Sequence, residues 1–547
     1  MRVRTRGRLA LALTLALFLP AQGYAAQADA DEGASLTRAT HGATTRAEHA
    51  ARALRRAQAL LHTPASHPSS RARTGRRTGH ATATRTGRDA TLALRDLALS
   101  IDSLSGADRR AADRLLARPT DSAADPDGTA KYRVPGEVTC SEHFCVHWVT
   151  STADAPPVAD SDGDGVPDWV RTTEGVLEHV WDSIVVDAGY REPKSDEGSP
   201  DHGPDGRLDV YLADVGVNKV YGYCTSDDPE RAVRFDVSSY CVLDNDFSPD
   251  QFPTAPHAAL EVTAAHEFFH AVQFSYDWTE DRWLTEGTAA WMEDVVYDAI
   301  NDNRQYLALS PLARPDLPVD FDQYGAWVFW RYLAELFGSP GTPDRSVIRQ
   351  VWEAADAAPG GPDASSLQAV RQVAAGHGVG FADLFAGFAR VNRTPARWYD
   401  EGSHYPRAPL SASYRLTRLD RSTTAQHVEL SHLSSGYVRF RPTRSLRGRW
   451  RLRLVLDLPD RVRGPVATTV VHRRGGHEKV QRIALNRHGR ARLVLPFNRA
   501  HVAWVELDLS NASDRFVCWQ GTGLSCDGAP LDDFLPFRYT ATAVSGL

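Results

Sequence analysis

HAALEVTAAHEFFHAVQFS, residues 257–275, is the most informative stretch of this 547-residue chain. Its residue pattern predicts an α-helix. Within it, His266 and His270 stand four residues apart, so on a helix both side chains project from one face about one turn apart. Two ring nitrogens in that arrangement can converge on one metal ion. A five-residue pattern also arises by chance in a long chain, so a metal site needs a third ligand from elsewhere.

The segment WLTEGTAAWMED, residues 283–294, offers that ligand. It predicts the beginning of a second helix that carries Glu286. Gly287 and Ala289 keep the nearby face small, as the close approach of two helices around an ion demands. Glu293 lies two turns further along the same face, where its carboxylate can accept the free N–H of a metal-bound histidine.

The first 26 residues have the composition of a secretory signal peptide. Four arginines precede the apolar run LALALTLALFL (9–19), and small residues follow it, which predicts cleavage near Ala26 or Ala28. A membrane anchor is the alternative, but a transmembrane helix needs about 20 apolar residues and this run is too short. No later run is long and apolar enough to span a bilayer, so we expect an exported chain without a stable membrane anchor.

Cysteine usage agrees with export. The six cysteines form three couples that are close in sequence, and the short loops favour pairing within each couple, although six cysteines allow 15 connectivities. An exported protein makes disulfides more probable than thiolate metal sites. The candidate pairs are Cys140 with Cys145, Cys224 with Cys241, and Cys518 with Cys526.

Residues 27–125 differ in charge from the rest of the chain. Between Ser35 and Arg118 there are 16 arginines and no lysine against six acidic residues, a local charge of +10 in a chain of net charge −7. The part from about 63 to 89 has low complexity and few large apolar residues, which predicts disorder. The leucine-rich part that follows predicts one or two short helices. We interpret the segment as a pro-region; a solvated linker or a cell-wall-binding arm is the alternative for its disordered half.

Two regions of different pattern follow. Residues 131–406 contain early strands and later helices, which predicts an α+β domain, whereas residues 410–547 alternate with period two, which predicts an all-β sandwich of roughly seven strands. The expected strands of the first region are 143–150 and 207–214, and its expected helices are 173–185, 257–275, 286–300 and 324–338.

The loop DSDGDGVPDW predicts a calcium site. Four aspartates and a backbone carbonyl stand at positions 1, 3, 5, 7 and 9 of a calcium-binding loop: Asp160, Asp162, Asp164, Val166 and Asp168. Position 12 is Arg171 instead of the glutamate of an EF-hand, so the loop is more like the calcium repeats of extracellular proteins. A solvated acidic turn is the alternative. Asp205 and Asp209 suggest a second such loop, but a plain turn before a strand is the favoured interpretation of these residues.

HEFFH followed by WLTEGTAAWMED resembles the gluzincin zinc metallopeptidases, in which HExxH and a downstream glutamate in an N-E-G-x-A-like segment complete the site. This match covers residues 266–293. From about Asp89 onward the chain also resembles a family of largely uncharacterised secreted bacterial metalloproteases with an aspartate-rich loop and a β-rich tail. The resemblance implies a gluzincin-like catalytic domain, zinc bound by His266, His270 and Glu286, and Glu267 as catalytic base.

In the aminopeptidase branch of the gluzincins a tyrosine stabilises the oxyanion, which makes Tyr324 the candidate here; a buried core tyrosine is the alternative. The chain has no G-x-M-E-N-like stretch to recognise a free amine, which favours an endopeptidase acting on proteins or peptides. In that reaction zinc lowers the pKa of a water molecule toward about 7 and polarises the scissile carbonyl. Glu267 would take the proton of that water.

One rival belongs to another class: an extracellular, calcium-stabilised binding or adhesion protein whose zinc site is vestigial. Glu267 separates the two readings, because a metal kept only for structure needs no base beside its ligands. Nucleic-acid binding is disfavoured, since the basic stretch has no interleaved aromatic residues and is expected to be removed.

Overall fold

The computed structural model describes residues 46–62, 90–121, 130–199, 201–231, 233–339 and 341–545. The predicted signal peptide and the stretch predicted to be disordered lie outside these residues. From Arg46 onward the chain forms one compact unit. Among the described helices, none has the length and apolar character needed to cross a membrane.

Three helices precede the first sheet: α1 (Arg46–Leu61), α2 (Ala90–Ser100) and α3 (Gly106–Leu116). The prediction of one or two short helices in the leucine-rich part of the pro-region is confirmed by α2 and α3. Helix α1 was not predicted, although its buried residues, such as Ala50, Leu54, Ala57 and Leu61, recur at helical spacing. In the structure α1 packs against α2, and α2 packs against a strand of the sheet that follows.

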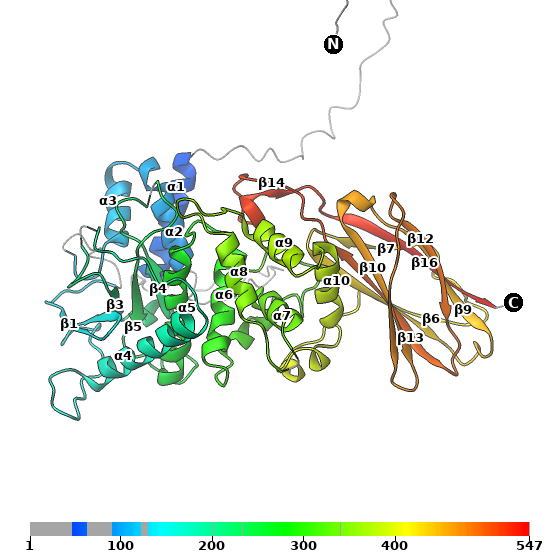
Figure 1. Ribbon diagram of the computed structural model, residues 1–547, viewed down its shortest axis with the longest axis horizontal. Helices are drawn as coiled ribbons and strands as arrows, with labels where there is room; N and C mark the ends of the chain where they lie inside the picture. Colours follow the sequence, from blue (N-terminus) through cyan, green and yellow to red (C-terminus); the bar gives the residue numbers. More distant parts are fainter. Residues whose placement is uncertain are drawn as a thin grey trace, which may run out of the picture. The chain divides into compact units, whose positions relative to one another are not determined.

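The region of residues 131–406 begins with a mixed five-stranded sheet (Figure 1). Its order is β1-β2-β3-β5-β4, with β2, β3 and β5 parallel and the two outer strands antiparallel to their neighbours. The predicted strands at 143–150 and 207–214 are confirmed as β2 and β3. The strands are β1 (Glu137–Cys140), β2 (Phe144–Trp148), β3 (Leu208–Ala213), β4 (Gly222–Thr225) and β5 (Tyr240–Asp244).

Helices cover this sheet and extend away from it. Helix α5 packs against β4 and β5, α6 packs against α5, and α7 packs against α6. All four predicted helices are present; the one predicted over 286–300 begins four residues earlier, after Asp281, and ends at Val296. The helices are α4 (Asp168–Trp181), α5 (Pro256–Phe274), α6 (Arg282–Val296), α7 (Trp327–Phe337), α8 (Ser346–Ala354), α9 (Ser366–Gly376) and α10 (Phe381–Val391). The α+β class is therefore confirmed for this region.

Residues 412–545 form two sheets of mainly antiparallel strands around one apolar core. One sheet has the order β11-β10-β13-β8-β6 and the other β12-β9-β16-β7. All seven segments with period-two alternation lie on strands; β6 and β7, which are short, were missed. The strands are β6 (Ala412–Leu416), β7 (Gln426–Leu430), β8 (Ser434–Pro442), β9 (Trp450–Asp457), β10 (Pro465–Arg473), β11 (Glu478–Arg482), β12 (Arg490–Pro496), β13 (Val502–Asn511) and β16 (Leu535–Ser545), with a small pair β14 (Phe516–Val517) and β15 (Ala529–Pro530).

Buried polar contacts join this all-β part to the helices. His432 lies between Asp320 and Asp533, with ring nitrogens 2.9 and 2.6 Å from their carboxylates. Asp281, at the start of α6, accepts hydrogen bonds from the backbone N–H groups of Cys526 and Asp527. The loop that supplies them is closed by a disulfide, and all three predicted disulfides are present: Cys140–Cys145, Cys224–Cys241 and Cys518–Cys526.

Candidate metal centre

Two buried helices bring the predicted ligands together. His266 and His270 project from α5, and Glu286 projects from the first turns of α6. The Glu286 Oε2 atom lies 3.3 Å from Nε2 of His266 and 3.7 Å from Nε2 of His270. All three side chains have no exposed surface. Their ligand atoms lie within 4.8 Å of one another, so the set is compact enough to hold one ion.

Each histidine is oriented by a second polar group. Nδ1 of His266 lies 2.7 Å from the Glu293 carboxylate, and Nδ1 of His270 lies 2.8 Å from Oε1 of Gln273. The Gln273 amide nitrogen donates to the Thr285 carbonyl, so its oxygen is the atom that faces His270 and accepts. Both imidazoles therefore carry hydrogen on Nδ1 and direct Nε2 toward Glu286.

The predicted contact of Glu293 with a histidine is present, whereas no role was assigned to Gln273 from the sequence. The signal was available, because Gln273 follows His270 by three residues and such pairs meet on a helix. Gly287 has a different neighbour from the one expected. A Cβ atom there would lie 2.6 Å from Nε1 of Trp330, so Gly287 permits the approach of α7 to α6 and not that of α5.

The electrostatics of the cluster favour a cation. Burial alone would raise the pKa of the Glu286 carboxyl, but the facing His270 and His266 hold that pKa well below its usual range. Burial alone would lower the pKa of His266, yet Glu286 and Glu293 raise it to about 9. Two carboxylates thus surround the imidazoles and stabilise positive charge between them.

Unsatisfied polar atoms point to the same conclusion. Among the described residues, Nε2 of His270 and Oε1 of Glu286 are buried without a hydrogen-bond partner. Buried polar atoms without partners are costly in a folded protein. Two imidazole nitrogens and a carboxylate oxygen are a donor set that suits zinc and leaves a fourth position open. The residues therefore fit the metal that the sequence implies.

Glu267 lies beside this centre on the next face of α5. Its side chain is buried, and its Oε2 accepts a hydrogen bond of 3.1 Å from the Thr91 hydroxyl of α2. It also packs against the edge strand β4, since a Cβ atom at Gly222 would lie 3.1 Å from Cγ of Glu267. Thr91 was not predicted at the site, because 176 residues separate it from Glu267.

Tyr324 is close to the centre but outside a helix, since α7 begins only at Trp327. Its ring centroid lies 6.3 Å from that of His266, and the ring stacks on Tyr306 at 4.8 Å. The residue is thus both near the ligands and part of the apolar packing around them.

The aspartate-rich loop lies outside this centre, on the surface. Asp160, Asp162 and Asp164 bring carboxylate oxygens within 4.8 Å of one another. Asp168 does not join them, because its carboxylate accepts hydrogen bonds from the backbone and hydroxyl of Ser161. Arg171 binds Asp164 in the same loop.

The other residues of the loop and its suggested repeat have partners within the chain. The Val166 N–H donates to Asp164. Asp205 pairs with Arg207, and Asp209 is buried against Arg118. In the suggested repeat the charge of both aspartates is therefore balanced by arginine.

Comparisons with known proteins add little. No family model matches the chain, and no curated protein matches it. Among solved structures, a family GH115 4-O-methyl-α-glucuronidase with specificity for decorated arabinogalactans is similar over 55% of this chain, at 10% identity and a TM-score of 0.14. The chain spans 43% of that enzyme's length. A similarity of this size bears on neither the fold nor the reaction.

Proposed function

We propose that the chain is a secreted, zinc-dependent endopeptidase with a gluzincin-type centre. The observation that carries the proposal is the convergence of His266, His270 and Glu286 from two helices, with Glu267 beside them. A structural metal would need the three ligands but not the adjacent carboxylate. Export is supported by the predicted signal peptide and by three disulfides, which persist in oxidising compartments.

The chain's own residues have separate tasks in this reaction. His266, His270 and Glu286 would hold the ion, while Glu293 and Gln273 fix the imidazoles in the tautomer that presents Nε2. A bound zinc ion supplies a Lewis acid that acidifies water near neutral pH and polarises a carbonyl. Glu267 accepts a proton from the attacking water and returns it to the leaving amine. Tyr324 is the proposed donor to the developing oxyanion.

Zinc content tests the metal part of this proposal. We expect one zinc per chain by mass spectrometry in the wild type and strongly reduced zinc in Glu286→Gln, a substitution that keeps the volume and removes the charge. Glu293 offers a comparison, because Glu293→Gln changes a partner of His266 and not a ligand, so it should weaken zinc binding less. Unchanged tight binding in Glu286→Gln would remove Glu286 from the site.

Hydrolysis of unfolded casein tests the catalytic part. Because residues 27–125 are predicted to be a pro-region, the assay should use the chain cut at an engineered protease site between residues 122 and 129. We expect zinc-dependent hydrolysis that Glu267→Gln abolishes while zinc content stays at wild-type level. A zinc-loaded wild-type chain that cleaves nothing after it has been cut and separated from the N-terminal segment would favour the rival interpretation, a binding protein with a vestigial site.

A further inference from the structure

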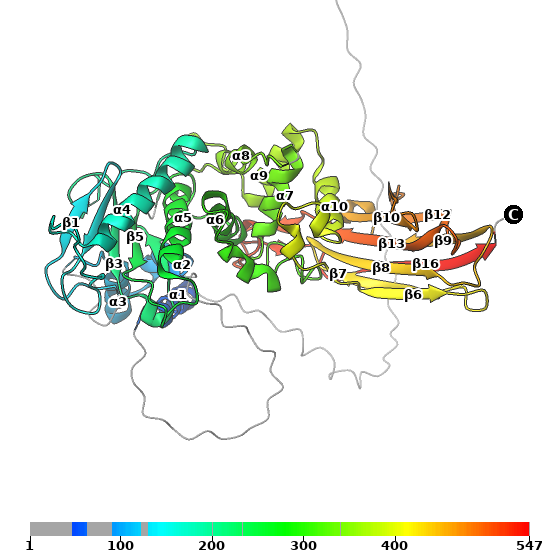
Figure 2. The ribbon, with the colours of Figure 1, turned by 90° about the horizontal axis from the view of Figure 1, so that it is seen from below.

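Helix α2 fills the side of the sheet next to the candidate metal centre. In both views it lies beside α5 (Figures 1 and 2), and it packs directly on β4. Its first six residues, Ala90–Arg95, are all buried. Since β4 is the last strand of the sheet, a helix from the predicted pro-region occupies the edge where no further strand pairs.

The edge of β4 presents a backbone donor at Cys224. This residue lies opposite Cys241 in an antiparallel pair, with a Cα–Cα distance of 4.1 Å and a disulfide between the two. So short a distance is typical of a pair without mutual hydrogen bonds, in which the N–H of each residue points away from its partner. The Cys224 N–H therefore points to the free edge of the sheet.

Thr91 binds this donor and the candidate base at the same time. Its hydroxyl oxygen accepts the Cys224 N–H at 3.0 Å and donates to Oε2 of Glu267 at 3.1 Å. A peptide added to the sheet edge would use the same N–H for one of its carbonyls. A water molecule attacking that peptide would need the same oxygen of Glu267. One threonine thus takes two positions that hydrolysis requires.

The residues after Thr91 attach α2 to the beginning of α6. Arg95 donates to the backbone carbonyl of Glu280 at 2.7 Å and to that of Trp278 at 3.4 Å. Asp96 pairs with Arg282, the first residue of α6. Because α6 carries Glu286 and α5 carries Glu267, α2 makes contacts with the segments that position both.

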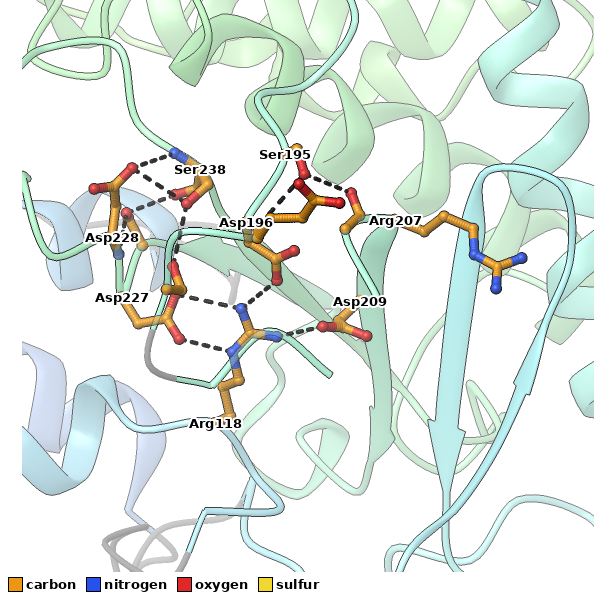
Figure 3. Close-up of polar contacts among 12 residues, drawn as sticks. Arg118, Ser195, Asp196, Arg207, Asp209, Asp227, Asp228 and Ser238 are labelled. Carbon is orange, nitrogen blue, oxygen red and sulfur yellow. Dashed lines mark hydrogen bonds and ion pairs between the residues drawn. The ribbon is translucent and has the colours of Figure 1, made fainter. Parts of the chain in front are cut away.

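A second attachment lies at the end of the same segment. Arg118 is buried among three carboxylates, and Figure 3 shows its guanidinium facing Asp196, Asp209 and Asp227. Two of the contacts measure 2.6 Å to Asp196 and 2.7 Å to Asp227, and Asp209 is also within hydrogen-bonding distance. His147 binds the other oxygen of Asp209 at 2.6 Å. At Arg118, the positively charged N-terminal segment is thus held to carboxylates of the acidic remainder of the chain.

We propose that residues 90–118 are an internal inhibitor of the candidate centre: Thr91 blocks Glu267 and the β4 edge, while Arg95 and Arg118 hold the segment in place. This proposal rests on the proposed function. It divides activation into two steps. A cut between residues 122 and 129 separates the segment from the catalytic part, and the segment must then leave Asp196, Asp209 and Asp227 before a substrate can enter.

The experiment compares the intact chain, carrying an engineered protease site between residues 122 and 129, before and after cutting and separation. Casein hydrolysis reports activity, and hydrogen–deuterium exchange of residues 220–226 reports access to the Cys224 amide without any need for catalysis. Thr91→Val keeps the volume and removes the hydroxyl. Arg118→Ala removes the second attachment, and Arg109→Ala is its control, since within the described part of the chain Arg109 pairs with the exposed carboxylates of Asp102 and Asp113.

We expect the intact chain to hydrolyse casein only slowly, and the cut and separated chain to hydrolyse it much faster, with faster exchange at Cys224. In the intact chain, Thr91→Val should raise both exchange and hydrolysis by about tenfold, the effect of losing one hydrogen bond to a charged group. After cutting, Arg118→Ala should release the segment at least tenfold faster than Arg109→Ala. If Arg118→Ala fails to fold, Thr91→Val still provides the test.

Two outcomes would overturn the inhibitor: equal hydrolysis by intact and cut chains, or exchange at Cys224 that neither cutting nor Thr91→Val changes. The failure of the proposed function has a different signature. In that case cutting exposes Cys224 and the chain binds zinc, but casein stays intact.

Discussion

At the scale of single residues, the orientation of His270 depends on Gln273. The glutamine can present only its oxygen to His270, because its nitrogen is held by the Thr285 carbonyl and the Thr288 hydroxyl. Gln273 therefore links the backbone of α6 to His270, the candidate metal ligand on α5. Partners of this kind influence metal affinity although they do not touch the metal.

We therefore expect Gln273→Leu to weaken zinc binding by about 10- to 100-fold, since the Nδ1–H of His270 loses its acceptor in a buried position. Competition with a chromophoric chelator measures the dissociation constant. Gln368→Leu, at an exposed position on α9, is the matched control and should bind zinc like the wild type. Wild-type affinity in Gln273→Leu would mean that His270 needs no such support.

The same scale shows why some site residues could be predicted and others could not. His266, His270 and Glu293 follow from helical spacing, which is a local property of the sequence. Glu286 required only the expectation of a second helix. Thr91 and Arg118 reach their partners across 176 and 91 residues, and no local pattern indicates such contacts. Their roles depend on how the predicted pro-region packs, which spacing does not encode.

At the scale of secondary-structure elements, the distance between α6 and α7 depends on Gly287. A side chain there would meet Nε1 of Trp330 at 2.6 Å and the Gln323 carbonyl at 3.1 Å. We expect Gly287→Ala to push the helices apart, lower the free energy of unfolding by about 1–3 kcal/mol and weaken zinc binding through the neighbouring Glu286. Urea denaturation and zinc titration measure the two effects.

Gly175→Ala provides the control for this substitution. Gly175 also lies in a helix, α4, but nothing lies within 4 Å of its added Cβ atom, so alanine there should be neutral or slightly stabilising. If Gly287→Ala behaved like Gly175→Ala, the packing of α6 on α7 would not position Glu286.

In the loop before α4, the predicted calcium site has three exposed aspartates close together in place of four. At millimolar calcium we expect a stabilisation of about 1–2 kcal/mol, because extracellular loops of this type bind weakly. Asp162→Asn should abolish the rise in melting temperature, whereas Asp420→Asn, on the surface of the all-β part, should not. A melting temperature indifferent to calcium would mean that the loop is a solvated acidic turn.

Elements also differed in how well the sequence predicted them. Long alternating strands such as β9 and β13 and the helix α5 were predicted, because each repeats its pattern over many residues. The strands β4 and β5 span four and five fully buried residues. A fully buried strand does not alternate, so it shows only as a run of strand-forming residues. The fully buried β2 and β3 lie in such runs, HFCVHWVT and RLDVYLAD, whereas β4 and β5 lie in short stretches between turn residues.

At the scale of the whole molecule, His432 joins the all-β part to the helices. Burial alone would lower the pKa of His432, but Asp320 and Asp533 raise it to about 9. A raised pKa in the folded state stabilises the protein fully below the unfolded value of about 6.5, and this stabilisation is lost as pH rises through about 9.

We expect the loss between pH 7 and 10 to be on the order of 3 kcal/mol, measured by urea denaturation across that range. In His432→Gln this part of the pH dependence should disappear. His427→Gln, on the exposed face of β7, should retain it. A flat pH profile in the wild type would show that the two carboxylates do not hold a charged imidazole.

The loop around Cys518–Cys526 has a consequence for folding. Asp281 stands directly before the helix that carries Glu286, and it accepts hydrogen bonds from the amides of Cys526 and Asp527. These amides lie 245 and 246 residues further along the chain, so Asp281 gains them only when the all-β part has folded against the helices. The start of the helix that carries Glu286 is therefore fixed by two parts of the molecule that are far apart in sequence.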